Sequence, residues 1–202
     1  MKIIRKIAVV LVIFSLLTST APMQAQAAKK ITDGNAKAYA KMINHLYKKS
    51  GSRWTASVIV HDMNNDGVPE LLYNDQPYGS CPHQNDVYTY KKGKVIKIGS
   101  CPDGIYKVPN SKTKYRYSTF TGVGCYEFGQ ITFSKKKIDV KTYGEYFGNP
   151  TKYYIKDKQV NEKKYLKEQK KYKKHMTNST VLKSTYFEGE KWTAFKVKSI
   201  VQ

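Results

Sequence analysis

Four side chains that carry oxygen are spaced closely in one short stretch of the chain. Asp62, Asn64 and Asp66 occupy alternate positions, and Glu70 adds a further carboxylate. Calcium in proteins takes about six to eight oxygen ligands in a flexible geometry, and alternate residues of a tight loop can turn their oxygens inward. The spacing therefore predicts a structural calcium site. Its predicted ligands are the side chains of Asp62, Asn64, Asp66 and Glu70 and the backbone carbonyl of Val68.

A polar hairpin turn is the alternative interpretation of this stretch. Asn65-Asp66-Gly67 alone makes a good turn, because Asn and Asp side chains bond to their own backbone and Gly tolerates a positive φ. A complete EF-hand loop would place a bidentate acid at its twelfth position, which is Tyr73 here. Three alternating acids or amides followed by Glu70 nevertheless exceed what a turn needs, so the calcium interpretation is favoured. An extracellular site of this kind binds calcium with a dissociation constant of about 10⁻⁴–10⁻³ M.

The loop resembles the D-x-[DN]-x-D-G-x-x-[DE] loops of integrin-type FG-GAP blades, which lie between two strands. It is more similar to the Asp-Gly-x-Pro-Glu-Leu loop of small secreted proteins and lipoproteins of Gram-positive bacteria. In those proteins the loop joins two strands behind an N-terminal helix, and a Tyr-rich hairpin like residues 87–95 often follows. The resemblance covers residues 36–98. It implies export and a calcium loop, and it implies no particular reaction.

The N-terminus has the three parts of a secretory signal peptide. Basic residues precede an apolar run over residues 7–17, and Ala25-Gln26-Ala27 supplies the small residues that signal peptidase reads. The run is shorter than the roughly 20 residues of a membrane span. We therefore expect a signal peptide at 1–27 and a single secreted domain at 28–202. An uncleaved N-terminal anchor is the alternative.

Three cysteines follow the predicted signal peptide: Cys81, Cys101 and Cys125. An extracellular location favours disulfides, and an odd number leaves one thiol over. Cys81 and Cys101 stand in matching Ser-Cys-Pro triplets on either side of a predicted hairpin, which brings them together at its open end. A Cys81–Cys101 disulfide is therefore predicted. Pairing with Cys125, or no bridge, are the alternatives.

Recognisable catalytic motifs are absent from the sequence. It contains no Gly-x-Ser-x-Gly, His-Glu-x-x-His, phosphate-binding loop or Cys-x-x-Cys. Cys81 and His83 are close in sequence, but a catalytic pair must also meet in space. His61 is expected on a strand surface. Carboxylates such as Asp103, Asp139, Glu127 and Glu145 could act as a pair only if the fold joined them. A binding role is therefore favoured over an enzyme, with a hydrolase of wall or extracellular polymers as the alternative.

The chain is strongly basic. It holds 36 Lys and Arg against 15 Asp and Glu, a net charge of +21, and subtracting the three bases of residues 1–27 leaves +18. A charge of this size attracts polyanions. Outside a cell these include teichoic acid and an anionic membrane surface, and we do not expect nucleic acid as a specific ligand. The alternative is that the lysines only keep the protein soluble.

The elements that carry these residues predict an α+β fold. Apolar residues at helical spacing predict an N-terminal helix over 36–49, capped by Asp33 or Asn35. Alternating and β-branched runs, separated by Gly, Pro and Asn, predict a mainly antiparallel, meandering sheet. The predicted strands are 54–61, 68–74, 86–90, 94–98, 105–108, 115–121, 125–133, 137–143, 152–155 and 159–160.

Two further elements are expected near the C-terminus. Asn161 is a good N-cap for a Lys-rich surface helix over 162–175, whose apolar stripe is narrow. Residues 192–201 are expected to return to a strand.

Overall fold

The computed structural model describes residues 31–51, 55–75, 84–122, 124–135, 137–148, 150–176, 179–187 and 189–202. Over these residues the protein is α+β, and all pairings between its strands are antiparallel. None of the helices in these ranges is long and apolar enough to cross a membrane. The predicted signal peptide, Cys81 and His83 lie outside the described residues.

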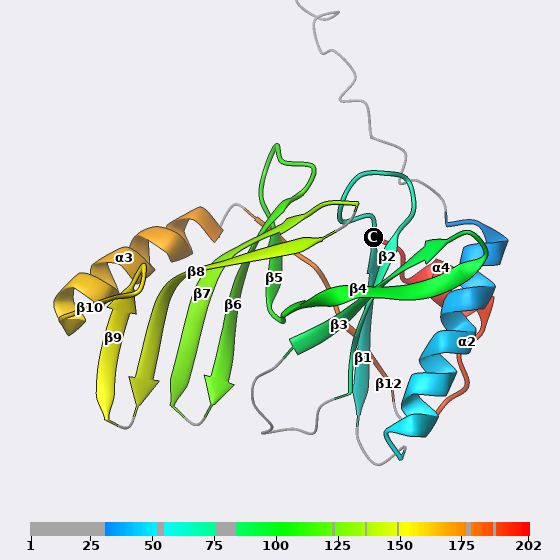
Figure 1. Cartoon of the computed structure of the whole chain (residues 1–202), viewed down its shortest axis with the longest axis horizontal. Coiled ribbons are helices and arrows are strands. Elements are labelled where there is room, and N and C mark those ends of the chain that lie inside the picture. The colour runs from blue at the N-terminus through cyan, green and yellow to red at the C-terminus, as the bar shows by residue number, and fades with distance from the viewer. Residues whose placement is uncertain are drawn as a thin grey trace, which may run out of the picture.

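The strands form two sheets that lie side by side (Figure 1). The first sheet has five strands in the order β12-β1-β2-β3-β4. They are β1 (Ala56–His61), β2 (Glu70–Asn74), β3 (Gln84–Lys91), β4 (Lys94–Pro102) and β12 (Thr185–Phe187).

The second sheet has seven strands in the order β10-β9-β8-β7-β6-β5-β11. They are β5 (Ile105–Lys107), β6 (Lys114–Gly122), β7 (Cys125–Phe133), β8 (Ile138–Gly148), β9 (Thr151–Ile155), β10 (Lys158–Val160) and β11 (Thr180–Val181). The chain passes from the first sheet to the second between β4 and β5. The expected single meander is therefore divided in two.

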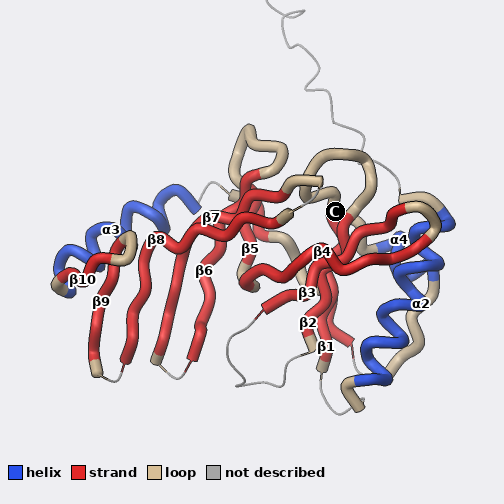
Figure 2. Tube along the Cα trace, viewed as in Figure 1, coloured by secondary structure: helices blue, strands red, loops and turns tan. Residues whose placement is uncertain are grey.

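Helices cover the two ends of the molecule, with the sheets between them (Figure 2). Helix α2 (Asp33–Lys49) packs on the first sheet, because Ala36, Tyr39, Ala40 and Ile43 recur on one helical face and are buried. Helix α3 (Glu162–Met176) covers one face of the second sheet through a narrower contact. A third core lies between the sheets, where residues of β1, β2 and β3 meet residues of β5, β6 and β7.

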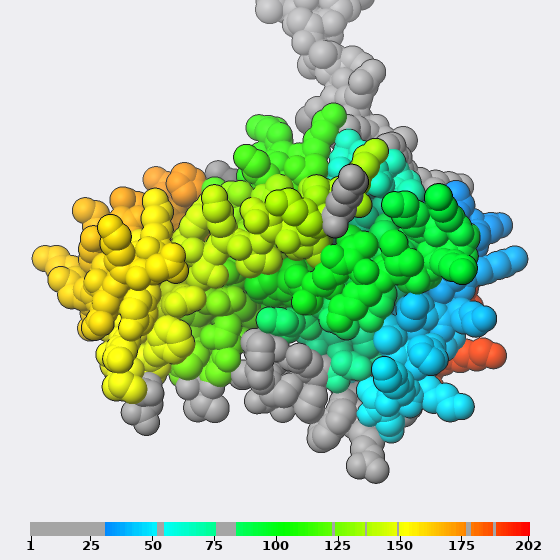
Figure 3. Space-filling model, in the orientation of Figure 1, coloured from blue at the N-terminus to red at the C-terminus, as the bar shows by residue number. Residues whose placement is uncertain are grey.

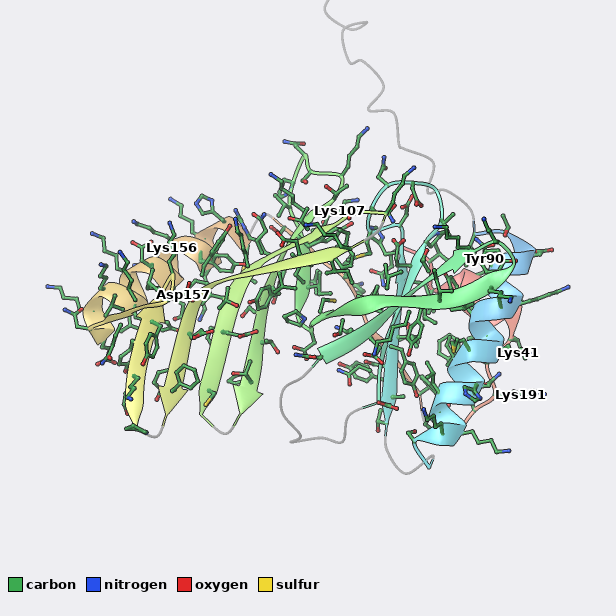
Figure 4. All side chains as sticks on the ribbon, in the orientation of Figure 1. Lys41, Tyr90, Lys107, Lys156, Asp157 and Lys191 are labelled. Carbon is green, nitrogen blue, oxygen red and sulfur yellow. The ribbon has the colours of Figure 1, made fainter. Side chains whose placement is uncertain are left out.

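Local turn and cap signals account for several boundaries. The β3–β4 hairpin turns at Lys92 and Gly93, and both residues have positive φ. The sequence predicts a turn here because glycine adopts positive φ readily. The β9–β10 hairpin turns at Lys156 and Asp157, which also have positive φ (Figure 4). The cap of α2 was expected at Asp33 or Asn35, but Thr32 fills this place, and its side chain accepts a hydrogen bond from the Asn35 N–H.

The C-terminal tail is not the expected strand. Residues Ala194–Ser199 form a short helix, α4, which begins where the Thr193 side chain accepts a hydrogen bond from the Lys196 N–H at 3.3 Å. Val197 is buried in the core beneath α2, and the strand character survives only as one bridge between Val201 and Val60. The Thr193 cap and the burial of Val197 on one side of the segment therefore favour a helix, although its β-branched residues would favour a strand.

Candidate functional site

The loop between β1 and β2 contains the predicted calcium ligands. His61 ends β1, Glu70 begins β2, and the two residues are paired in register, so the segment between them must return within one strand spacing. Asn65 and Gly67 have positive φ values of 57° and 92°, and these backbone angles allow the chain to reverse its direction sharply. The sharp reversal fits both the calcium loop and its alternative, the polar hairpin turn, so it does not decide between them.

The loop folds around its own side-chain oxygens. The Asp62 carboxylate accepts hydrogen bonds from the N–H groups of Asp66 (3.1 Å) and Gly67 (2.9 Å). The Asn64 side-chain oxygen accepts from the same Asp66 N–H at 2.9 Å, and Asp66 accepts from the Val68 N–H at 2.9 Å. The side chains of Asp62 and Asn64 therefore converge on one nitrogen in the middle of the loop.

Glu70 joins this network from the base of the loop. Its carboxylate accepts a hydrogen bond from the Met63 N–H at 2.8 Å and another from the Asn64 side-chain amide at 2.9 Å. The side chain is completely buried. The pKa of Glu70 is raised to about 8, mainly because the carboxyl group is buried; the Met63 hydrogen bond lowers it, and the nearby charges of Asp66 and Asp62 add to the rise.

Lysine and arginine do not neutralise these carboxylates. The four ion pairs among the described residues involve Asp33, Asp86, Glu168 and Glu190 as acids, and none involves the loop. In a chain with a net charge of +21 this is a local concentration of unpaired negative charge. Of these acids Glu70 is fully buried, and burial of a carboxylate without a basic partner favours binding of a proton or of a cation.

The donor types suit a hard divalent cation, although the loop is closed by its own hydrogen bonds. Carboxylate and amide oxygens come from all four predicted side chains, and the hydrogen bonds link them into one group. Val68 takes part through its N–H. Across the described ranges, however, no three His, Cys, Asp or Glu side chains already stand close enough together to form a metal cluster.

His61 is buried, which corrects the expectation of a strand-surface position. Its ring lies edge-on to Tyr115 at 6.1 Å between centroids, and its Nδ1 lies 2.5 Å from the Gln202 carbonyl oxygen. Burial lowers the pKa of His61, with the Gln202 contact acting in the opposite direction. Tyr115 belongs to the second sheet, which packs over His61. The alternation of residues in β1 does not reveal that another sheet packs there.

Cys101 is not suited to be a reactive centre. Its sulfur is buried, and burial raises the pKa of the thiol. A buried thiol of this kind is a poor nucleophile because the thiolate is the reactive form. Since Cys81 lies outside the described residues, the Cys81–Cys101 disulfide stays a prediction.

Two carboxylates that the sequence left separate are directly opposite each other in the second sheet. Glu127 on β7 pairs in register with Glu145 on β8. Phe128 packs against Tyr165 and Tyr172 of α3, so the neighbouring Glu127 points to the other face of the sheet. Side chains in such a pair have Cβ atoms about 4.5–5.5 Å apart.

A change of register brings this pair together. The β7–β8 hairpin starts with Phe133 opposite Ile138, and this register would place Glu127 opposite Gly144. A bulge at Phe128–Gly129 shifts the pairing by one residue, so that Glu127 meets Glu145 instead. Burial raises the pKa of both carboxyl groups, and the charge of Glu145 raises the pKa of Glu127 further.

No protein-family model, no curated protein and no solved structure matches this chain.

Proposed function

We propose that residues 28–202 form an exported, basic binding protein, held at the cell wall by anionic polymers, in which the Asp62–Glu70 loop binds a structural calcium ion. The observation that carries the calcium proposal is Glu70. It is a fully buried carboxylate beside Asp62 and Asp66, and none of the three forms an ion pair with a basic side chain in the described ranges.

Calcium would replace the proton that burial favours on Glu70. The side chains of Asp62, Asn64, Asp66 and Glu70, with the Val68 carbonyl, would supply the oxygens, and water would complete the shell. The ion would join the end of β1 to the start of β2. Its role would be structural, because binding to the folded state alone stabilises that state by mass action.

Thermal melting tests this proposal. With a dissociation constant of about 10⁻⁴–10⁻³ M, 10 mM calcium should stabilise the fold by about 1.4–2.7 kcal/mol, which is roughly 3–10 °C in Tm. The measurement compares calcium with chelator in the wild type and in Asp66→Ala. Only the wild type should respond. Equal melting temperatures in all four samples would refute the calcium site.

The polyanion part of the proposal is supported by the net charge of +21. Contacts between lysines and phosphates release counterions, so their strength falls steeply with salt. We expect the protein to stay on whole cells at low salt and to leave them at high salt. Retention that high salt does not change would contradict an electrostatic attachment.

A second candidate function is hydrolysis of wall or extracellular polymers, and the facing pair Glu127–Glu145 favours it. Glycoside hydrolysis uses two carboxyl groups, one of them with a raised pKa as the proton donor. Like charges directly opposite each other destabilise a sheet, so the pair carries a stability cost that a catalytic role would explain.

The hydrolase candidate is tested with a panel of wall-polymer and peptide substrates. Glu127→Gln and Glu145→Gln should each abolish turnover while folding is kept, and Cys81→Ser serves as the control for a cysteine centre. Turnover by both Gln variants at the wild-type rate, or no turnover of any substrate by the wild type, would remove this candidate.

A further inference from the structure

Helix α3 uses a narrow face to hold itself on the second sheet. Tyr165 and Tyr172 are its buried residues, and both rings pack on Phe128 of β7. The Tyr172 hydroxyl also donates to the backbone carbonyls of Tyr117 and Gly129. These contacts fix which side of the helix faces solvent.

The opposite side of α3 is covered by lysines. The helix contains seven lysines and two glutamates in 15 residues. We define the lysine face as Lys163, Lys164, Lys167 and Lys170, all of which are exposed. At about 100° per residue, Lys163, Lys167 and Lys170 lie on the side away from Tyr165 and Tyr172, and Lys164 flanks them.

The lysine face makes little contribution to the fold that the described residues show, beyond the charge of Lys167. The Lys171 hydrogen bond lowers the pKa of the Glu168 carboxyl, and the charge of Lys167 lowers it further. Other lysines of the helix have partners: Lys171 pairs with Glu168 at 2.9 Å, and Lys173 lies 5.9 Å from the Tyr126 ring centroid. The four lysines of the lysine face form no ion pair with any described residue. Like charges three and four residues apart destabilise a helix. The arrangement therefore lowers helix stability unless an anion neutralises it.

We infer that the lysine face of α3 is the docking surface for a linear phosphate polymer without bases, such as a phosphodiester polymer of the cell wall. This inference rests on the polyanion part of the proposed function and assigns it to one surface. Lys163, Lys167 and Lys170 recur every three to four residues, or about 4.5–6 Å along the helix axis. A flexible chain of phosphates can follow such a row and place one charge near each ammonium group.

The composition of the face favours such a polymer over a membrane or a nucleic acid. A helix that binds a bilayer buries an apolar face in it, but the large aromatic side chains of α3 face the sheet. Leu166 is the one large apolar side chain that α3 exposes along its fully described length. Stacking on bases needs aromatic or Arg side chains, and the lysine face has neither.

The test compares two variants with equal charge loss on different helices. One is Lys163→Gln, Lys164→Gln, Lys167→Gln and Lys170→Gln on α3. The control is Lys37→Gln, Lys41→Gln, Lys48→Gln and Lys49→Gln on α2. The control lysines are also exposed, and α2 lies at the other end of the molecule (Figures 3 and 4). Binding of fluorescent long-chain polyphosphate is measured by anisotropy at several salt concentrations, and circular dichroism checks that each variant is folded.

The expected result is a loss confined to the α3 variant. Its affinity at low salt should fall at least tenfold, and the slope of log K against log salt should fall by about three to four. The α2 variant should change the slope by less than about one. Equal losses in both variants would overturn the inference and leave a diffuse polyanion attraction intact.

Two further probes separate the ligand classes. Tighter binding to vesicles of equal phosphatidylglycerol and phosphatidylcholine, or to a single-stranded oligonucleotide, than to polyphosphate would overturn the assignment of a phosphate polymer. Failure of the wild type to bind any of the three probes would refute the polyanion part of the proposed function together with this inference. The calcium response in thermal melting is independent of either result.

Discussion

Replacing Glu70 by Gln should remove a pH dependence of stability and the response to calcium together. Glu70 has an ordinary pKa of 4.5 and a pKa of about 8 in the folded protein. Because the folded pKa is the higher one, the contribution to stability is complete below pH 4.5 and is lost as the pH rises to about 8. Between these values each pH unit removes about 1.4 kcal/mol.

The magnitude follows from this slope. From pH 5 to pH 7 the calcium-free wild type should lose about 2–3 kcal/mol relative to Glu70→Gln, or roughly 5–10 °C in Tm. His61 acts in the opposite sense, since its lowered pKa contributes stability that is lost as the pH falls. That contribution is present in both proteins and largely cancels in their difference.

Melting curves at pH 5, 6 and 7 in chelator provide the assay. The gap between the two proteins should widen as the pH rises, and calcium should narrow it by stabilising the wild type alone. Calcium should also act more strongly at pH 7 than at pH 5, because it competes with the proton on Glu70. Parallel curves for wild type and variant from pH 5 to pH 7 would refute the argument that Glu70 is buried at a cost.

Three further predictions concern the scaffold. Tyr172→Phe should lower the free energy of unfolding in urea by about 1–3 kcal/mol, because the Tyr172 hydroxyl donates to two backbone carbonyls. Tyr115→Phe should be neutral or stabilising, because the Tyr115 hydroxyl is buried and has no partner among the described residues. Equal losses of stability in the two variants would contradict this. Gly129→Ala should cost about 3 kcal/mol, since its new methyl group would lie 2.1 Å from a backbone oxygen of β8, and an unchanged urea midpoint would disprove that contact. The Cys81–Cys101 disulfide would stabilise the fold by about 3 kcal/mol, and non-reducing peptide mapping should find the linked pair; two free thiols would show the prediction to be wrong.

The sequence predicts the local features well because their signals lie within a few residues. The helical spacing of Tyr39 and Ile43, the Lys92-Gly93 turn and the reversal at Asn65 and Gly67 all appear in the structure. Each depends on backbone propensity or on hydrogen bonds between near neighbours. The alternation of Asp62, Asn64 and Asp66 predicts a calcium site, and the hydrogen bonds of these side chains to the loop backbone match the turn that was its alternative.

The rest depends on contacts between residues far apart in the chain. The burial of Glu70 and His61 requires the second sheet to pack against the first, and the facing pair Glu127–Glu145 requires a bulge that shifts the register by one residue. Strand propensity does not determine which sheet a strand joins, because the same alternation fits either one. The sequence alone therefore determines which oxygen-bearing side chains the loop contains and the charge of the chain, whereas tertiary packing decides which carboxylates lose their water and which meet.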